Sequence, residues 1–202
     1  ESPSLDSRFW MKFLKSLYAH GTFIENNLEY HWRNGNHFLS DVVGLIFLGI
    51  FFQDAEFGKR WLQRGVAALP EEMERQVYPD GVDYEKSTSY QRLVLELFYP
   101  PAILCQKNNI RLPEHFFQRL EKMFEYVQHY SRPDGSLPLF GDADDGRLFR
   151  FVMGETINDH RHTLSVGAVL FERNDFARSA GKFCQDSLWL FGGEGFEKHQ
   201  RL

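Results

Sequence analysis

The chain has 202 residues, 43% of them hydrophobic and 16% aromatic, which is enough apolar material to bury a core and excludes an intrinsically disordered protein. Its formal net charge is −5 and no run of basic residues occurs, which excludes a nucleic-acid-binding protein. The longest apolar run, residues 42–52, is shorter than the roughly 18 residues of a membrane span, so we expect no membrane-spanning segment.

Apolar residues recur at helical spacing in most of the chain, whereas strand-like alternation is nearly absent. Turn sequences such as Asn34-Gly35 separate the helical patterns. Pro100 and Pro101 should kink or break the helix that contains them, because proline lacks the amide donor and clashes with the preceding turn. The predicted helices, the first of them interrupted near Gly21, cover residues 8–31, 36–53, 56–77, 88–107, 113–131, 160–173 and 177–191.

Individual residues add detail to this mainly α prediction. Ser87 and Thr88 precede a helical pattern and are suited to cap it, because their hydroxyl groups accept hydrogen bonds from first-turn amides. Cys105 and Cys184 lie in apolar helical patterns without the Cys-x-x-Cys spacing of a metal or redox site. We therefore predict two buried free thiols.

One short sequence occurs twice. The segments VYPDG at residues 77–81 and YSRPDG at residues 130–135 each follow an amphipathic helix, and their aspartates lie 54 residues apart. This period suits one helical hairpin with its loops, and stacked antiparallel hairpins form either a superhelix or a closed α/α toroid. Chance recurrence of a common turn tripeptide is the alternative.

The first polar segment that is a candidate for chemistry is HWRNGNHF at residues 31–38, which leads into the most apolar helical pattern of the chain. Asn36 is suited to be an N-cap, a role worth about 1 kcal/mol, and His37 to be a satisfied residue near the surface. The alternative is that both side chains serve a site at the start of this helix.

The second candidate segment is residues 80–92, in which Tyr90 and Arg92 lie at a helix start. A tyrosine has an unperturbed pKa of about 10, so a phenolate at neutral pH needs nearby positive charge or strong hydrogen bonds. A tyrosine that only packs by its ring is the alternative.

The third candidate segment is the acidic stretch GDADDGR at residues 141–147. Asp142, Asp144 and Asp145 could belong to a calcium loop, but the distal glutamate of an EF-hand is missing. They could also supply a carboxylate pair for glycoside hydrolysis, which needs a spatial separation that a sequence cannot give. The third interpretation is a turn stabilised by aspartate side chains and by an Asp142–Arg147 contact.

Taken together, the three segments resemble the signature of the bacterial heparinase II/III-like polysaccharide lyases. NGNHF at residues 34–38 is similar to the Asn-His at a helix start in that family, and QVYPDGVDYEKSTSY at residues 76–90 is similar to its Q-x-x-x-D-G-x-x-x-E-x-S-x-x-Y pattern. The acidic stretch is similar to its G-D-x-D-x-G-R segment. The resemblance covers about residues 30–150. Gln91 departs from it, because many relatives have histidine after the tyrosine.

This resemblance implies an incomplete α/α toroid built of antiparallel helical hairpins, here a single domain over residues 1–202 of a larger two-domain lyase. In full-length relatives an antiparallel β-sandwich domain follows. We expect that domain to be absent from this chain and to pack on it in the whole protein. The implied partner is an anionic polysaccharide, heparan-sulfate-like or alginate-like, and the implied reaction is β-elimination across a uronic acid.

The resemblance also implies roles for individual residues. Asn36 and His37 would neutralise the uronate carboxylate, and Tyr90 would act as general acid or base. A further catalytic histidine belongs to the β-rich part of the relatives, so we assign that role to no histidine here. No metal or cofactor is required in this scheme. Three neighbouring charged residues are predicted to contact the sugar: Arg33, Glu85 and Arg92.

Two other functions remain open at this point. One is an α/α-toroid glycoside hydrolase that uses carboxylates such as Asp80, Asp142 or Asp144. The other is a non-catalytic glycan-binding domain. A periplasmic or cell-envelope location is expected from what such lyases usually do.

Overall fold

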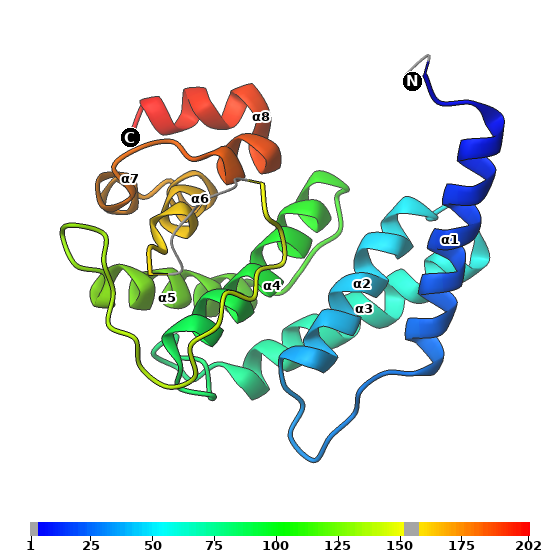
Figure 1. The fold of residues 1–202 in the computed structure, drawn as a ribbon, viewed down its shortest axis with the longest axis horizontal. Coiled ribbons are helices and arrows are strands. Elements are labelled where there is room, and N and C mark those ends of the chain that lie inside the picture. Colours follow the sequence, from blue (N-terminus) through cyan, green and yellow to red (C-terminus); the bar gives the residue numbers. More distant parts are fainter. Residues whose placement is uncertain (1–3, 152–157) are drawn as a thin grey trace. The chain divides into compact units, whose positions relative to one another are not determined.

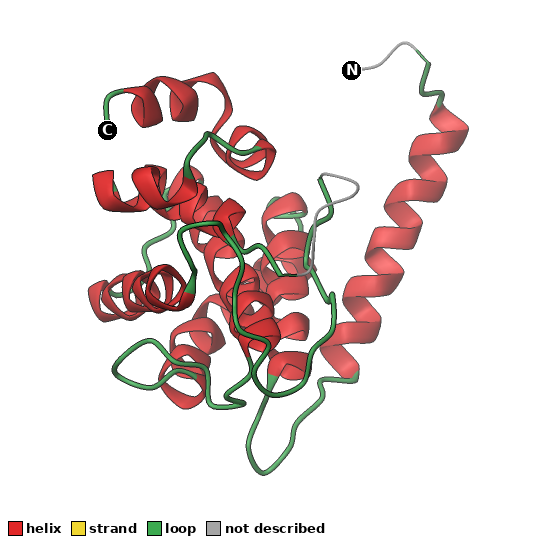
Figure 2. Ribbon diagram, turned by 60° about the vertical axis from the view of Figure 1, so that its left-hand side comes forward, coloured by secondary structure: helices red, strands yellow, loops and turns green. Residues whose placement is uncertain are grey.

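The computed structural model describes residues 4–151 and 158–202, and these residues are mainly helical (Figures 1 and 2). No β-strand forms within these two ranges, where Val77 and Asp83 make an isolated antiparallel bridge. The prediction of a mainly α chain is therefore confirmed. The helices are α1 (Ser7–Asn26), α2 (Asn36–Phe51), α3 (Glu56–Gln76), α4 (Thr88–Lys107), α5 (Glu114–Tyr130), α6 (Arg161–Phe171), α7 (Asn174–Ala180) and α8 (Gln185–Gln200).

The chain divides into two compact units, residues 1–71 and residues 72–202. The boundary between them falls inside α3. Each of the two units is compact by itself. The division does not test whether residues 1–202 form a single domain, and that stays a prediction.

In the first unit, α1 is fixed to α3 around one carboxylate. Glu25 accepts hydrogen bonds from Arg60 at 2.6 and 2.9 Å and from the Trp61 indole at 2.9 Å. The hydrogen bond from Arg60 is the main cause that lowers the pKa of Glu25 to about 2. A Cβ atom at Gly21 would lie 2.4 Å from the Trp61 ring, so this glycine permits close packing. The predicted interruption of the helix at Gly21 is wrong.

The end of α1 also differs from the prediction, because the helix stops at Asn26 rather than near residue 31. The side-chain amides of Asn26 and Asn27 donate to the carbonyl groups of Thr22 and Phe23 at 2.7 and 2.8 Å. These side chains satisfy carbonyl groups that a longer helix would have used itself.

The helix α2 is the apolar centre of the first unit. Its buried side chains include Leu39, Leu45 and Ile46. A Cβ atom at Gly49 would lie 2.5 Å from the backbone nitrogen of Leu62, so α2 and α3 approach each other closely there. Within the described part of the chain, no helix combines the length and the apolar character that crossing a membrane requires.

In the second unit, α4 is buried along most of its length and contacts α5 and α6, while α6 contacts α5, α7 and α8 (Figure 1). Pro100 and Pro101 are buried inside α4, which continues from Thr88 to Lys107. The predicted break at these prolines is wrong. Packing on several sides offsets their cost, which is about 3 kcal/mol for each proline in a helix interior.

The last predicted helix, residues 177–191, is in fact two helices. Gly181, with a φ of 74°, ends α7, and its amide donates to the Ala177 carbonyl at 3.1 Å. The following helix α8 continues to Gln200 across a kink at Gly192, whose φ is 67°. Left-handed glycines therefore cause both the end of α7 and the kink in α8. The helical spacing of apolar residues did not reveal either of them.

Both cysteines are buried free thiols, as predicted. Burial raises the pKa of the Cys105 thiol to about 11. At neutral pH this thiol is protonated, and Cys105 is therefore a core residue rather than a nucleophile.

The first Pro-Asp-Gly sequence forms a short hairpin loop. The Gly81 amide donates to the Tyr78 carbonyl at 2.9 Å, and the Tyr78 amide donates to the Val82 carbonyl at 2.8 Å. Asp80 Oδ1 accepts from the Val82 amide at 3.2 Å, and Gly81 has a φ of 89°. This is a three-residue hairpin loop that ends on a left-handed glycine.

The second Pro-Asp-Gly sequence forms the same loop, with equivalent hydrogen bonds. The Gly135 amide donates to the Arg132 carbonyl at 2.8 Å, and the Arg132 amide donates to the Ser136 carbonyl at 2.8 Å. Asp134 Oδ1 accepts from the Ser136 amide at 2.9 Å, and Gly135 has a φ of 87°. The sequence echo therefore corresponds to a repeated structural element.

Candidate active site

The start of α2 carries three of the predicted site residues. Gly35, which has no side chain, is the N-cap of this helix, and Asn36 is its first residue. The interpretation of Asn36 as the N-cap is therefore wrong. Asn36 is half-buried, as is Arg33 in the preceding loop. Asn34 is buried and accepts a hydrogen bond from the His31 amide at 3.2 Å, which shapes this loop.

His37 lies on the open side of the same helix start. Its side chain is 67% exposed, and its Nδ1 lies 3.0 Å from Glu29 Oε2. The Glu29 amide donates to the Asp41 carboxylate at 2.9 Å. Burial raises the pKa of Asp41. The structure thus gathers Arg33, Asn36 and His37 in the first unit, with the histidine accessible to a ligand.

The start of α4, which carries Tyr90, is held by side chains from the helix itself. Ser87 is the N-cap, and its hydroxyl accepts from the Tyr90 amide at 3.2 Å, so the predicted cap is confirmed at Ser87, whereas Thr88 is the first residue of the helix. Gln91 is buried, accepts from the Asp83 amide at 2.7 Å and donates to the Gly81 carbonyl at 2.9 Å. The residue that departs from the family pattern therefore fixes the preceding turn.

The acidic segment lies along this helix start. The Thr88 amide donates to the Phe140 carbonyl at 3.0 Å, and the Thr88 hydroxyl donates to the Pro138 carbonyl at 3.0 Å. The Ser87 hydroxyl donates to the Asp142 carbonyl. These bonds join residues 50–55 positions apart in the sequence and bring the third motif to the second.

Tyr90 is half-buried, and three carboxylates, those of Asp144, Glu85 and Asp142, act on its phenol through their charge. Burial is the largest cause that raises the pKa of Tyr90, and the charges of Asp144, Glu85 and Asp142 raise it further. At neutral pH Tyr90 therefore keeps its proton and is suited to donate one.

The other two residues predicted from this segment differ in exposure. Glu85 is half-buried, and its amide donates to the Asp83 carboxylate at 3.1 Å. Arg92 is only 2% exposed and donates to the Gly146 carbonyl at 2.8 Å. Burial lowers the pKa of Arg92. The structure gives Arg92 a role inside the protein, and its contact with a sugar stays a prediction.

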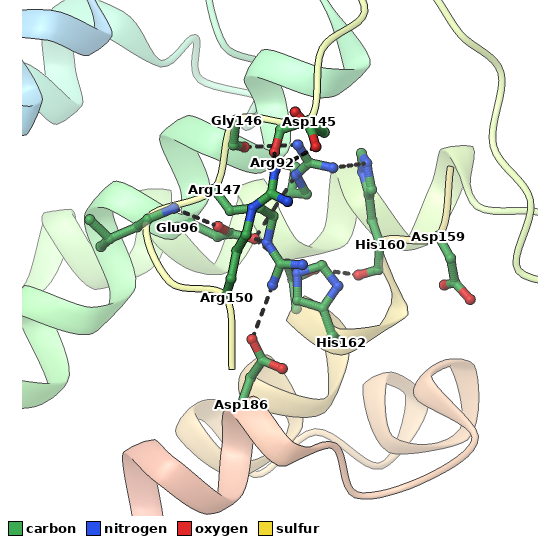
Figure 3. A network of polar contacts seen from close by, with 12 residues as sticks. Arg92, Glu96, Asp145, Gly146, Arg147, Arg150, Asp159, His160, His162 and Asp186 are labelled. Atoms are coloured by element: carbon green, nitrogen blue, oxygen red, sulfur yellow. Dashed lines mark hydrogen bonds and ion pairs between the residues drawn. The ribbon is translucent and has the colours of Figure 1, made fainter. Parts of the chain in front are cut away.

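A buried polar network next to Arg92 was not predicted from the sequence (Figure 3). Glu96 Oε1 lies 2.7 Å from Arg147 Nε and 2.9 Å from His162 Nε2, and Arg147 Nη2 lies 3.1 Å from Asp186 Oδ1. Arg147 was expected beside Asp142 but pairs instead with Glu96 and Asp186. The network links α4, α6, α8 and the acidic segment.

A second branch of the network runs through His160. Its Nδ1 lies 2.7 Å from the Tyr130 hydroxyl, and its Nε2 lies 3.5 Å from Arg92 Nη1. Burial raises the pKa of Tyr130, which stays protonated. The sequence contains one signal for this network, namely charged residues within apolar helical patterns, such as Glu96 and Asp186. Such residues are expected to be buried, and buried charges need partners.

The predicted site residues thus fall into two groups. One group lies in the first unit and the other, Glu85, Tyr90 and Arg92, lies in the second. Within residues 4–151 and 158–202, no cluster of three or more histidine, cysteine or acidic side chains is arranged to hold a metal ion. The chemistry available at the start of α4 is proton donation by a neutral phenol.

The sequence matches the family described as Heparinase II/III N-terminus over residues 1–161, so the chain belongs to this family. A heparin-sulfate lyase from Pedobacter heparinus is 28% identical over 144 residues, which cover 70% of this chain and 21% of that protein. A heparin-sulfate lyase from Bacteroides stercoris has the same identity and coverage. The chain spans about a fifth of the length of these curated relatives.

Solved structures have the same fold. Heparan sulfate lyase HepC from Pedobacter heparinus has a TM-score of 0.66 and 24% identity, and the match covers 92% of this chain and 28% of that chain. A heparinase III has a TM-score of 0.68 and 26% identity, with 90% of this chain and 27% of that chain covered. The predicted fold class, an incomplete α/α toroid of helical hairpins, is confirmed.

Proposed function

We propose that this chain is the helical part of a lyase that cleaves a uronic-acid-containing polysaccharide by β-elimination. The substrate class is heparan-sulfate-like or alginate-like. The observation that carries the proposal is the neutral phenol of Tyr90 at the start of α4, in a chain of the Heparinase II/III N-terminus family. Relatives named heparin-sulfate lyases support the same reaction.

In this proposal the start of α2 binds the uronate. Loss of the proton at C5 is slow until the charge that moves into the carboxylate is stabilised by preorganised donors. The Asn36 amide and the exposed His37 imidazole are the donors. One such donor contributes about 3 kcal/mol to lowering the barrier. Arg33 and Glu85 would contact the sugar outside the reacting atoms.

Tyr90 protonates the leaving group. A base removes the C5 proton, the C4–O bond breaks, a C4=C5 double bond forms, and the phenol gives its proton to the glycosidic oxygen. The family resemblance implies a further catalytic histidine in a β-sandwich domain that would pack on the helical part, and in this proposal that histidine is the base. A general acid of this kind accelerates a reaction about 10²- to 10⁴-fold. A periplasmic or cell-envelope location belongs to the same proposal.

The experiment is to incubate the full-length protein with heparan sulfate, alginate, polyglucuronate and chondroitin and to follow the ultraviolet absorbance of the new double bond. Tyr90→Phe should lower the rate about 10²- to 10⁴-fold with unchanged folding. Tyr78→Phe is the control, because Tyr78 is an exposed tyrosine of the same unit. Full activity of Tyr90→Phe would remove Tyr90 from the mechanism. New reducing ends without a double bond would indicate a hydrolase, and binding without turnover a glycan-binding domain.

A further inference from the structure

A fully exposed tryptophan lies in the loop of residues 27–35, which joins α1 to α2 (Figure 1). Trp32 is 96% exposed, and its indole makes no hydrogen bond and no ring contact with the part of the chain that the structure describes. In contrast, Trp61 is buried, and Trp10 and Trp189 each contact a phenylalanine ring. Packing of the first unit therefore does not account for the indole of Trp32.

The backbone before Trp32 is held in place by Tyr30. The centroid of its ring lies 4.7 Å from that of Phe38, which is buried in α2. The Tyr30 hydroxyl accepts a hydrogen bond from Arg64 Nη2 at 3.2 Å, and Arg64 belongs to α3. Tyr30 thus fixes this side of the loop to two helices.

The backbone after Trp32 is fixed as well. The buried Asn34 accepts a hydrogen bond from the His31 amide at 3.2 Å, so Trp32 and Arg33 lie inside a closed turn. The next residue, Gly35, is already the N-cap of α2. A loop that is fixed before a ligand arrives loses less conformational entropy when the ligand binds.

This turn places the indole beside the residues proposed to bind the uronate. Arg33 follows Trp32 directly, and Asn36 lies four positions further on, a separation of at most about 14 Å along the chain. The His37 side chain nearby is 67% exposed. A flat apolar surface next to a positive charge and polar groups matches an acidic sugar chain, whose rings have apolar C–H faces and polar edges.

We propose that Trp32 is a substrate-binding residue, whose indole stacks on the C–H face of a sugar ring close to the uronate bound at the start of α2. The proposal rests on the proposed function of that helix start. The stacked ring is not the reacting one, so the ground state and the transition state gain equally from the contact. Trp32 should therefore act on KM rather than on kcat.

The first test is Trp32→Ala in the full-length protein, assayed by double-bond absorbance. We expect KM to rise about tenfold or more with kcat nearly unchanged, because aromatic anchors are among the residues whose truncation weakens binding most. Trp32→Phe keeps an aromatic face and should restore most of the affinity. Thermal unfolding should stay the same, because the side chain is exposed.

Two comparisons separate stacking from other effects. Phe51→Ala is the matched control, because Phe51 is a 52% exposed aromatic residue at the opposite end of α2, about 22 Å along the helix from Asn36. Its KM should not change. The indole has no charge, so the ratio of KM between Trp32→Ala and the unaltered protein should not depend on salt concentration.

A second measurement does not depend on turnover. The fluorescence of Trp32 is the difference between the protein and its Trp32→Phe version, and acrylamide should quench it efficiently because the indole is exposed. Saturating heparan sulfate, alginate, polyglucuronate or chondroitin should lower this quenching several-fold. Unchanged quenching with all four would overturn the proposal, whether or not the protein eliminates. Protection of Trp32 without any new double bond would support the stacking contact, and the proposed lyase function would then fail.

Discussion

The two helix starts that carry the candidate residues are built differently. At α2 the cap is Gly35, and His37 projects into solvent with 67% of its side chain exposed. At α4 the cap is Ser87, Gln91 fixes the preceding turn, and the Ser87 hydroxyl donates to the Asp142 carbonyl of the acidic segment. This difference agrees with the roles proposed for the two helix starts, because an open start suits binding of an incoming sugar and an anchored start suits a proton donor that must be held in place.

The largest expected effect comes from breaking the anchor of α4. Glu96→Ala leaves Arg147 and Arg92 with less compensation for their buried charges, and we expect a loss of about 3–5 kcal/mol in the free energy of unfolding. Urea denaturation followed by circular dichroism measures it. Glu29→Ala, at the open start of α2, is the control and should cost less than about 1 kcal/mol. Equal losses of unfolding free energy in the two variants would contradict the difference in anchoring between the starts of α2 and α4.

A smaller loss is expected when the turn before α4 is released. Gln91→Ala removes partners from the Asp83 amide and the Gly81 carbonyl, which are buried, and each unsatisfied group costs about 1–3 kcal/mol. Gln91→His, the residue of many relatives, should lose less, because an imidazole offers one donor and one acceptor. Thermal unfolding of the two variants measures the difference in stability. A Gln91→His variant less stable than Gln91→Ala would contradict the view that the hydrogen bonds of this side chain stabilise the turn.

The smallest effect on stability is expected at the open start. His37→Ala removes an exposed pair with Glu29, so the free energy of unfolding should change by less than about 1 kcal/mol. Turnover of a uronate polysaccharide should nevertheless fall, because His37 is proposed to bind the carboxylate. Stability is measured by thermal unfolding and activity by double-bond absorbance. A large stability loss would show that this start is anchored too.

Much of the fold follows from the periodicity of apolar residues. The predicted helices at 36–53, 56–77, 88–107 and 113–131 agree with α2 to α5, because each has a clear apolar face and turn residues at its ends. The ends of α1 and α7 were missed. Side-chain hydrogen bonds of asparagines end α1, and a left-handed glycine ends α7. Neither feature changes the spacing of apolar residues, so the spacing could not reveal these ends.

The candidate site was only partly predictable. Tyr90 and Asn36 stand out through the family motifs, and the cap at Ser87 through its residue type. The network around Glu96 was not visible, because its partners Leu148 and His162 lie 52 and 66 residues away along the chain. Sequence identifies a charge that needs a partner, but only the packing of α4 against α6 and the acidic segment identifies which partner it has.

The two Pro-Asp-Gly loops have a consequence for sequence variation. Their backbones are the same, but a Cβ atom at Gly81 would lie 2.2 Å from the Lys122 carbonyl oxygen, whereas one at Gly135 would meet the guanidinium group of Arg161. Main chain cannot move aside, while the end of a long side chain can. One local conformation thus tolerates replacement unequally at its two positions, and natural variants of this chain should change the second glycine before the first.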